Sequence, residues 1–158
     1  MEKVIGIGEW AVSNNINDSI KTYALGSCVA VTVYCFDKRV LGMAHIALPY
    51  SGIKVTEAKP EAYFADKALP LLIDKVCQLS LEPSPKLIIK LFGGAQSNNR
   101  LDVFNVGQRN IAAIKNILEQ QGFPYDSLNT GGNVSRTVSA YVADGNCEVH
   151  KYPLSTSG

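Results

Sequence analysis

Two neighbouring segments with strand periodicity, separated by a short polar break, constrain the fold of this chain most strongly. Residues 29–34 alternate valines with Ala, Thr and Tyr residues, which is the period-two pattern of a β-strand. A polar triplet at residues 37–39 interrupts this pattern, and residues 40–48 resume it until Pro49. The two segments therefore predict a β-hairpin, and with it a sheet that contains antiparallel pairs.

The remaining patterns predict two helices and further strands. Apolar residues recur at helical spacing over residues 61–80, and Pro70 is expected to kink or split this helix. A second helix is expected from a cap at Asn105 or its neighbours to about residue 121, with Gly122 as its C-cap. Other strands are expected at residues 3–12, 19–25, 86–92, 125–129, 134–142 and 146–151. This order predicts one α+β domain over residues 1–158, with a mixed or largely antiparallel sheet.

Composition excludes several classes of protein. The 158 residues are 46% hydrophobic and 18% charged, which argues against a disordered chain and against a coiled coil. Fifteen Lys and Arg residues against fourteen Asp and Glu residues give a net charge of +1, so we expect no binding to nucleic acid. No stretch reaches the roughly 18 apolar residues of a membrane span, and the first residues lack the pattern of a signal peptide. We expect a cytoplasmic protein that is not embedded in the membrane.

The cysteines and histidines indicate separate thiols in a reducing compartment. The four cysteines never form a Cys-x-x-Cys motif, and the two histidines have no metal-binding spacing, so a structural zinc site is not expected. These residues are Cys28, Cys35, Cys77, Cys147, His45 and His150. A buried structural role is the usual one for a free cysteine, and we expect it for the three that lie in apolar patterns.

Cys28 differs from the others because it follows Gly26 and Ser27 at a corner that enters the first strand of the hairpin. If the hairpin closes with a two-residue turn, His45 lies opposite Ala30, on the face that Cys28 shares. The thiol and the imidazole are then diagonal neighbours, with α-carbons about 7 Å apart. A three-residue turn would place them on opposite faces, and His45 would then be an ordinary core histidine.

Such a pair has the chemistry of a nucleophile and its base. An imidazolium lowers the pKa of a neighbouring thiol, and the same ring can then protonate a leaving group. A third group has to orient the imidazole, and the Thr22 hydroxyl is the candidate. Backbone N–H groups at Gly26, Ser27 and Cys28 are candidates for stabilising an oxyanion. No metal or organic cofactor is needed for this chemistry.

Two glycine pairs and one arginine have simpler interpretations. Gly93-Gly94 indicates a close approach of the backbone to a neighbouring loop or to a substrate, because glycine has no side chain to obstruct it. Gly131-Gly132 indicates a tight corner. Arg136, which follows this corner, is interpreted as a surface charge.

Ordered blocks of residues along almost the whole chain match a known pattern. They are Val4-Ile5-Gly6-Ile7-Gly8-Glu9, Thr22, Leu25-Gly26-Ser27-Cys28-Val29-Ala30-Val31, Gly42-Met43-Ala44-His45 with Leu48-Pro49, Lys90-Leu91-Phe92-Gly93-Gly94-Ala95, Asn105-Val106-Gly107-Gln108-Arg109-Asn110, and Thr130-Gly131-Gly132-Asn133 with Arg136. On these blocks the chain strongly resembles the CheD family of chemoreceptor glutamine deamidases.

The resemblance implies a cysteine hydrolase whose Cys-His-Thr site corresponds to Cys28, His45 and Thr22. It implies that the substrates are glutamine side chains on the cytoplasmic helices of methyl-accepting chemotaxis receptors, which are converted to glutamate. It also implies a β-sandwich with two or three helices packed around it, as in the catalytic domain of cytotoxic necrotizing factor deamidase toxins.

The resemblance further implies a partner, a CheC-type phosphatase, and for some members a receptor methylesterase activity. The alternative function is therefore an adaptor that binds and regulates such a phosphatase with little catalysis of its own. A weaker alternative is a general cysteine peptidase.

Overall fold

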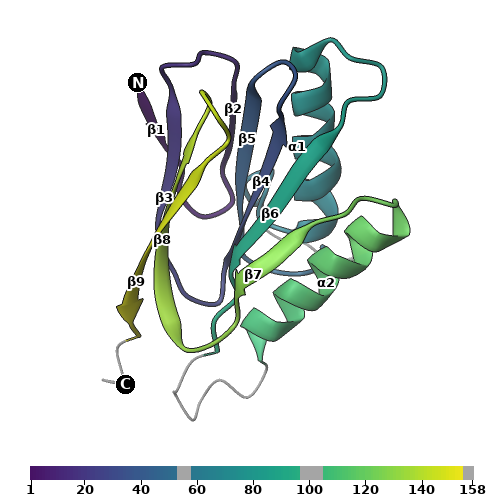
Figure 1. Ribbon diagram of the computed structural model, residues 1–158. Coiled ribbons are helices and arrows are strands. Elements are labelled where there is room, and N and C mark those ends of the chain that lie inside the picture. The colour runs from purple at the N-terminus through teal and green to yellow at the C-terminus, as the bar shows by residue number, and fades with distance from the viewer. Residues whose placement is uncertain (53–57, 97–104, 155–158) are drawn as a thin grey trace.

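The computed structural model describes residues 1–52, 58–96 and 105–154. Two β-sheets are stacked face to face, and two helices form a third layer on one side of the stack (Figure 1). The elements are β1 (Glu2–Val4), β2 (Trp10–Ser13), β3 (Ser19–Leu25), β4 (Val29–Cys35), β5 (Val40–Ile46), α1 (Ala65–Ser80), β6 (Leu87–Gly93), α2 (Val106–Gln120), β7 (Asp126–Thr130), β8 (Val134–Tyr141) and β9 (Cys147–Pro153). Neither helix is long and apolar enough to cross a membrane.

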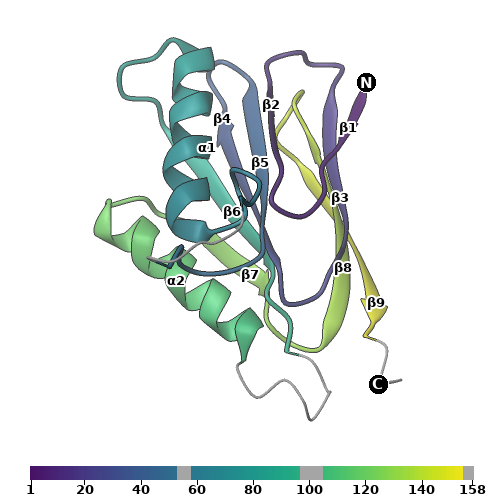
Figure 2. The same ribbon diagram turned by 180° about the vertical axis from the view of Figure 1, so that it is seen from behind.

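Both sheets are mixed, which confirms the predicted α+β class. The four-stranded sheet has the order β1-β3-β8-β9, and the five-stranded sheet has the order β2-β5-β4-β6-β7. The pairs β1–β3 and β6–β7 are parallel, and the other pairs are antiparallel. In the described part of the chain, both helices cover the outer face of the five-stranded sheet (Figure 2). The expectation that helices surround the sandwich is therefore corrected to a covering on one face.

The two faces of the five-stranded sheet explain this layering. All residues of β4 and β5 are buried, so this sheet needs an apolar neighbour on each side. Val29, Val31 and Val33 pack with the helices in one apolar cluster. Ala30 and Tyr34 pack with residues of the four-stranded sheet in a second cluster, which we call the inter-sheet cluster. The outer face of the four-stranded sheet carries no helix among the described residues.

The central hairpin has the register expected for a two-residue turn. The β4–β5 pairs run from Cys35 with Val40 to Val29 with Ile46, and Ala30 lies opposite His45. At the turn, the Arg39 N–H donates to the carbonyl of residue 36 at 3.3 Å. The alternative with a three-residue turn is therefore wrong, and His45 faces the same side of the sheet as Ala30.

Two sequence expectations for the first half of the chain are corrected. Residues 3–12 do not form one strand, because a turn at Gly6–Glu9 divides them into β1 and β2, which belong to different sheets. Helix α1 begins at Ala65 instead of residue 61 and continues without a break through Pro70. The missing N–H of Pro70 would have paired with the Asp66 carbonyl in the first turn, so only one bond near the helix start is lost.

Helix α2 ends as the sequence predicts. Gly122 has φ +76°, the left-handed conformation that glycine adopts readily. Its N–H donates to the Glu119 carbonyl at 3.1 Å, and the Phe123 N–H donates to the Leu118 carbonyl at 2.9 Å. Asn105 is the N-cap residue, as expected, but its side chain makes no capping hydrogen bond.

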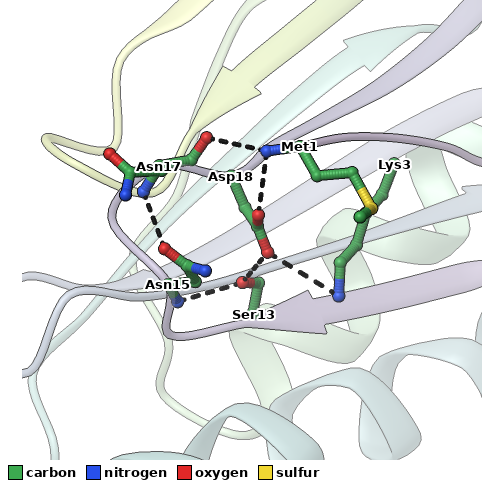
Figure 3. Close-up of polar contacts among 6 residues, drawn as sticks. All are labelled: Met1, Lys3, Ser13, Asn15, Asn17 and Asp18. Atoms are coloured by element: carbon green, nitrogen blue, oxygen red, sulfur yellow. Dashed lines mark hydrogen bonds and ion pairs between the residues drawn. The ribbon is translucent and has the colours of Figure 1, made fainter.

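A polar cluster fixes the start of β1 (Figure 3). The Asp18 carboxylate accepts hydrogen bonds from Ser13 Oγ at 2.7 Å and from the Met1 ammonium group at 3.1 Å, and Lys3 Nζ lies 3.8 Å away. The Ser13 hydrogen bond, followed by the ammonium group, lowers the pKa of Asp18. This cluster keeps β1 in parallel register with β3, and the register carries Ile5 to the middle of the sandwich.

Candidate active site

The imidazole of His45 and the hydroxyl of Thr22 meet in the buried space between the two sheets. Thr22 on β3 is 0% exposed and His45 on β5 is 4% exposed. Thr22 Oγ1 lies 2.7 Å from His45 Nδ1 and donates to the Ile5 carbonyl at 2.8 Å. The predicted contact between Thr22 and His45 is thus present in the structure.

The Ile5 carbonyl decides which nitrogen of His45 carries the proton. A hydroxyl has one hydrogen, and here it goes to a carbonyl that can only accept. Thr22 Oγ1 must therefore accept a hydrogen bond from Nδ1–H of His45. A neutral His45 then has its lone pair on Nε2, which is the nitrogen available as a base.

Nε2 of His45 is buried and has no hydrogen-bond partner among the described residues. Buried polar atoms are usually paired, because an unpaired one loses its bond to water without replacement. The same ring is held firmly on its other side by Thr22 and through its backbone. The His45 N–H donates to the Glu9 carbonyl at 3.0 Å, and the Gly8 N–H donates to the His45 carbonyl at 2.8 Å. The arrangement therefore presents an oriented and unused base.

The corner formed by Gly26, Ser27 and Cys28 lies between β3 and β4. A bulge after Thr22, with Ala24 at φ +53°, precedes the corner and shifts the register with β8. All three corner carbonyls accept hydrogen bonds, with donors Ala95 N–H at 2.8 Å, Asn110 Nδ2 at 2.9 Å and Gly94 N–H at 2.8 Å, in that order. No hydrogen bond within the described ranges is donated by the N–H of Ser27 or Cys28. These two N–H groups remain available to an oxyanion.

Gly93 confirms the predicted close approach of backbone at the glycine pair. It adopts φ +103°, and a Cβ atom at this position would lie 2.4 Å from the Cys28 carbonyl oxygen. A side chain at residue 93 would therefore displace the corner that carries the thiol.

Asn110 supports the site but was not predicted from the sequence. It is completely buried on α2, and its Nδ2 donates to the Ser27 carbonyl at 2.9 Å and to the Ala47 carbonyl at 3.0 Å. It therefore ties the corner before Cys28 to the chain just after His45. The signal that could have revealed it is a polar side chain on the apolar face of α2, one turn from the buried Gly107 and Ala113.

Cys28 is related to His45 through the register of the central hairpin. Its side chain is half-buried and packs against the inter-sheet cluster, while Ala30, two residues later, is the direct partner of His45. Among the described contacts, no hydrogen bond joins Cys28 Sγ to His45 Nε2. In sites without substrate, hydrogen bonds between catalytic groups are often not formed and tighten only in the complex. The remaining cysteines differ in burial: Cys35 is buried, whereas Cys77 and Cys147 are half-buried.

Burial makes the resting thiol and imidazole neutral. It raises the pKa of Cys28, and it lowers the pKa of His45 to about 4, against the opposing effect of the Glu9 carboxylate. The expectation of an imidazolium that lowers the thiol pKa in the resting protein is therefore wrong, because the space between the sheets disfavours both charges.

The pKa of His45 predicts a loss of stability in acid. An unfolded chain protonates this histidine near pH 6.5, whereas the folded chain does so only near pH 4. The unfolded state therefore binds more protons in this range, and the free energy of unfolding falls as the pH drops from 6.5 towards 4, by roughly 3 kcal/mol in total. Urea unfolding of the wild type and of His45→Gln, near neutral pH and near pH 4.5, measures how much His45 contributes to this loss of stability. An equal loss in both proteins would contradict the assignment.

Comparison with known proteins identifies the family to which the chain belongs. The sequence profile of a family described as CheD chemotactic sensory transduction matches residues 47–151. A protein of Syntrophotalea carbinolica named "Probable chemoreceptor glutamine deamidase CheD" is 44% identical over 146 residues, which cover 90% of this chain and 89% of the relative. This chain belongs to the CheD family.

Two further CheD relatives match most of the chain. A protein of Thermococcus kodakarensis, also named "Probable chemoreceptor glutamine deamidase CheD", is 36% identical over 153 residues, which cover 96% of this chain and 93% of the relative. This alignment includes Thr22, Cys28 and His45, which lie before the profile match. A protein of Bacillus velezensis named "Chemoreceptor glutamine deamidase CheD" is 36% identical over 137 residues, which cover 85% of this chain and 81% of the relative.

In residues 1–52, 58–96 and 105–154, no three His, Cys, Asp or Glu side chains form a group that could hold a metal.

Proposed function

We propose that this chain deamidates glutamine side chains on the cytoplasmic helices of chemotaxis receptors, with Cys28 as nucleophile, His45 as base and Thr22 as the group that orients His45. The observation that carries the proposal is the oriented imidazole, with Nδ1–H bound to Thr22 and a free lone pair on buried Nε2. The names of the CheD relatives, which specify chemoreceptor glutamine deamidation, support the reaction and the substrate class.

The first half of the reaction forms a thioester. His45 Nε2 takes the proton of the Cys28 thiol while the sulfur attacks the carboxamide carbon of the glutamine. The carbonyl oxygen becomes an oxyanion, for which the free N–H groups of Ser27 and Cys28 are the candidate donors. The protonated imidazole then gives its proton to the amide nitrogen, which leaves as ammonia when the C–N bond breaks.

The second half releases glutamate. His45 Nε2 takes a proton from water as the water oxygen attacks the thioester carbon. The C–S bond breaks, and the sulfur recovers its proton from the imidazolium. The product carboxylic acid ionises in water. Because the proton travels between sulfur, nitrogen and water alone, no metal or organic cofactor enters the cycle.

A single measurement separates this proposal from its alternatives. The full chain is mixed with the cytoplasmic fragment of a chemoreceptor, and the intact mass of the fragment is followed with time. Deamidation replaces an NH2 group by OH at each site, and peptide mapping locates the changed glutamines. Methylester hydrolysis, which we regard as an additional activity, instead lowers the mass of a pre-methylated fragment. A cysteine peptidase would cleave the fragment.

An adaptor for a CheC-type phosphatase remains the alternative function. An unchanged receptor mass, together with stable binding to such a phosphatase, would favour the adaptor and contradict the enzyme. The intact set of Thr22, Cys28 and His45 favours the enzyme, because an adaptor has no need of an oriented base. The relation of the sandwich to the cytotoxic necrotizing factor toxins stays a prediction of the sequence, as does the location in the cytoplasm.

A further inference from the structure

Arg136 on β8 is a buried cation that has no counter-ion among the described residues. Its side chain is 4% exposed, and its Nε and Nη1 atoms are enclosed and find no hydrogen-bond partner in that part of the chain. No ion pair joins it to another residue in the described part of the chain. The interpretation of Arg136 as a surface charge is therefore wrong.

This charge cannot be relieved by losing a proton. Burial lowers the pKa of Arg136, but a guanidinium stays charged near neutral pH because its ordinary pKa lies far above neutral. A buried charge with unpaired donors destabilises a folded protein, and proteins normally avoid it by pairing the charge. An arrangement that keeps such a charge is expected to serve a ligand that supplies the missing acceptors.

The guanidinium shares its surroundings with the candidate active site. Arg136 is the Cα partner of Leu25, the residue that precedes the Gly26–Cys28 corner. Arg136 and Val138 are two residues apart on β8, so their side chains point to the same face of the sheet. Val138 packs in the inter-sheet cluster, and the side chain of Arg136 therefore also lies between the two sheets.

The turn at Gly131-Gly132 links Arg136 to Gly93, which lies against the backbone of Cys28. Nη2 of Arg136 would lie 3.9 Å from a Cβ atom at Gly132. The neighbouring Gly131 donates its N–H at 2.9 Å to the carbonyl of Gly93, the residue that presses against the Cys28 carbonyl. Arg136 Nη2 therefore lies beside a turn that is hydrogen-bonded to Gly93, the residue against the Cys28 carbonyl.

We propose that Arg136 receives a carboxylate of the substrate, from an Asp or Glu side chain within one helical turn of the target glutamine. Carboxylates are the acceptors that fit a guanidinium best, because two parallel N–H bonds can form. Residues three or four apart on a helix lie on the same face, so a carboxylate at that spacing is presented to the protein together with the target glutamine. This inference rests on the proposed function and adds a rule of substrate selection to it.

Synthetic receptor-helix peptides with one target glutamine test the proposal. Each acidic peptide carries a glutamate three or four residues before or after the glutamine, and the matched neutral peptide carries methionine there. We expect the wild type to show a kcat/KM at least about 10-fold higher for one acidic peptide than for its neutral match. In Arg136→Met this ratio should fall to about one. Arg136→Lys should retain part of it, because lysine keeps the positive charge but lacks the planar guanidinium that donates two parallel hydrogen bonds.

Stability and binding provide readouts that do not depend on turnover. Because Arg136→Met removes an unpaired buried charge, we expect its thermal midpoint to rise by about 2–4 °C. In wild-type protein labelled with 15N, the Arg136 Nε–H resonance should shift with the acidic peptide and not with the neutral one. A ratio that persists in Arg136→Met, or a resonance that responds equally to both peptides, would overturn the proposal. A wild type that binds the acidic peptide through Arg136 but deamidates nothing would instead contradict the proposed function alone.

Discussion

Replacing Cys28 with alanine should reduce receptor deamidation by at least about 10⁴-fold while the protein stays folded. Removing the nucleophile of a covalent mechanism eliminates the thioester route, and no other group at the corner can form that intermediate. Stability should change little, because alanine fits the space of a half-buried cysteine whose side chain makes no hydrogen bond in the described contacts. The measurements are the deamidation rate on one receptor fragment and the thermal midpoint of the same preparation.

Cys77→Ala is the matched control for this prediction. Cys77 is also half-buried, and burial raises its pKa as it does that of Cys28, but it lies on α1 away from His45. Activity should survive in Cys77→Ala and disappear in Cys28→Ala. Near-wild-type turnover in Cys28→Ala would make the thioester mechanism untenable, whatever the control shows.

The neutral resting pair also predicts how Cys28 reacts with small reagents. Iodoacetamide requires the thiolate, so labelling of Cys28 in the free protein should be slow near neutral pH and should rise only above the usual thiol pKa of about 8.5. In the proposed mechanism, activation during turnover then depends on the bound substrate and on transfer of the thiol proton to His45.

The hairpin and the placement of Ala30 opposite His45 were predictable because they depend on local sequence. The alternation of β4, the polar triplet and the resumed pattern of β5 allow few registers, and burial of both faces penalises a slip by one residue. The end of α2 was predictable for a similar reason, since Gly122 can adopt a conformation that few residues tolerate.

The features that the sequence did not reveal depend on contacts between distant segments. The turn at Gly6–Glu9 sends β2 to the edge of the other sheet, and only that topology brings the Glu9 and Gly8 backbone to His45. Asn110 is a polar residue on an amphipathic helix until α2 packs against the end of the hairpin. The burial of Arg136 and the neutral state of the thiol and imidazole likewise follow from the stacking of two sheets, which no local pattern encodes.

Thr22→Val should reduce the deamidation rate by about 100-fold, a loss typical of removing a group that orients a functional histidine. Valine keeps the branched shape of threonine but supplies no hydroxyl. Nδ1–H of His45 then has no acceptor, the ring is free to place its proton on Nε2, and the base is lost. The Ile5 carbonyl loses its donor at the same time, so the variant should also be less stable, by about 1–3 kcal/mol.

Thr22→Ser provides the comparison that separates orientation from packing. Serine retains the hydroxyl that donates to Ile5 and accepts from Nδ1, and it loses only a methyl group from a completely buried site. If Thr22 orients His45, Ser should keep most of the rate although it leaves a small cavity, and Val should lose the rate although it fills the space. If Thr22 only fills space, the order reverses. Rates and urea midpoints of the three proteins on one receptor fragment decide between them, and an active Val variant with an impaired Ser variant would remove Thr22 from the site.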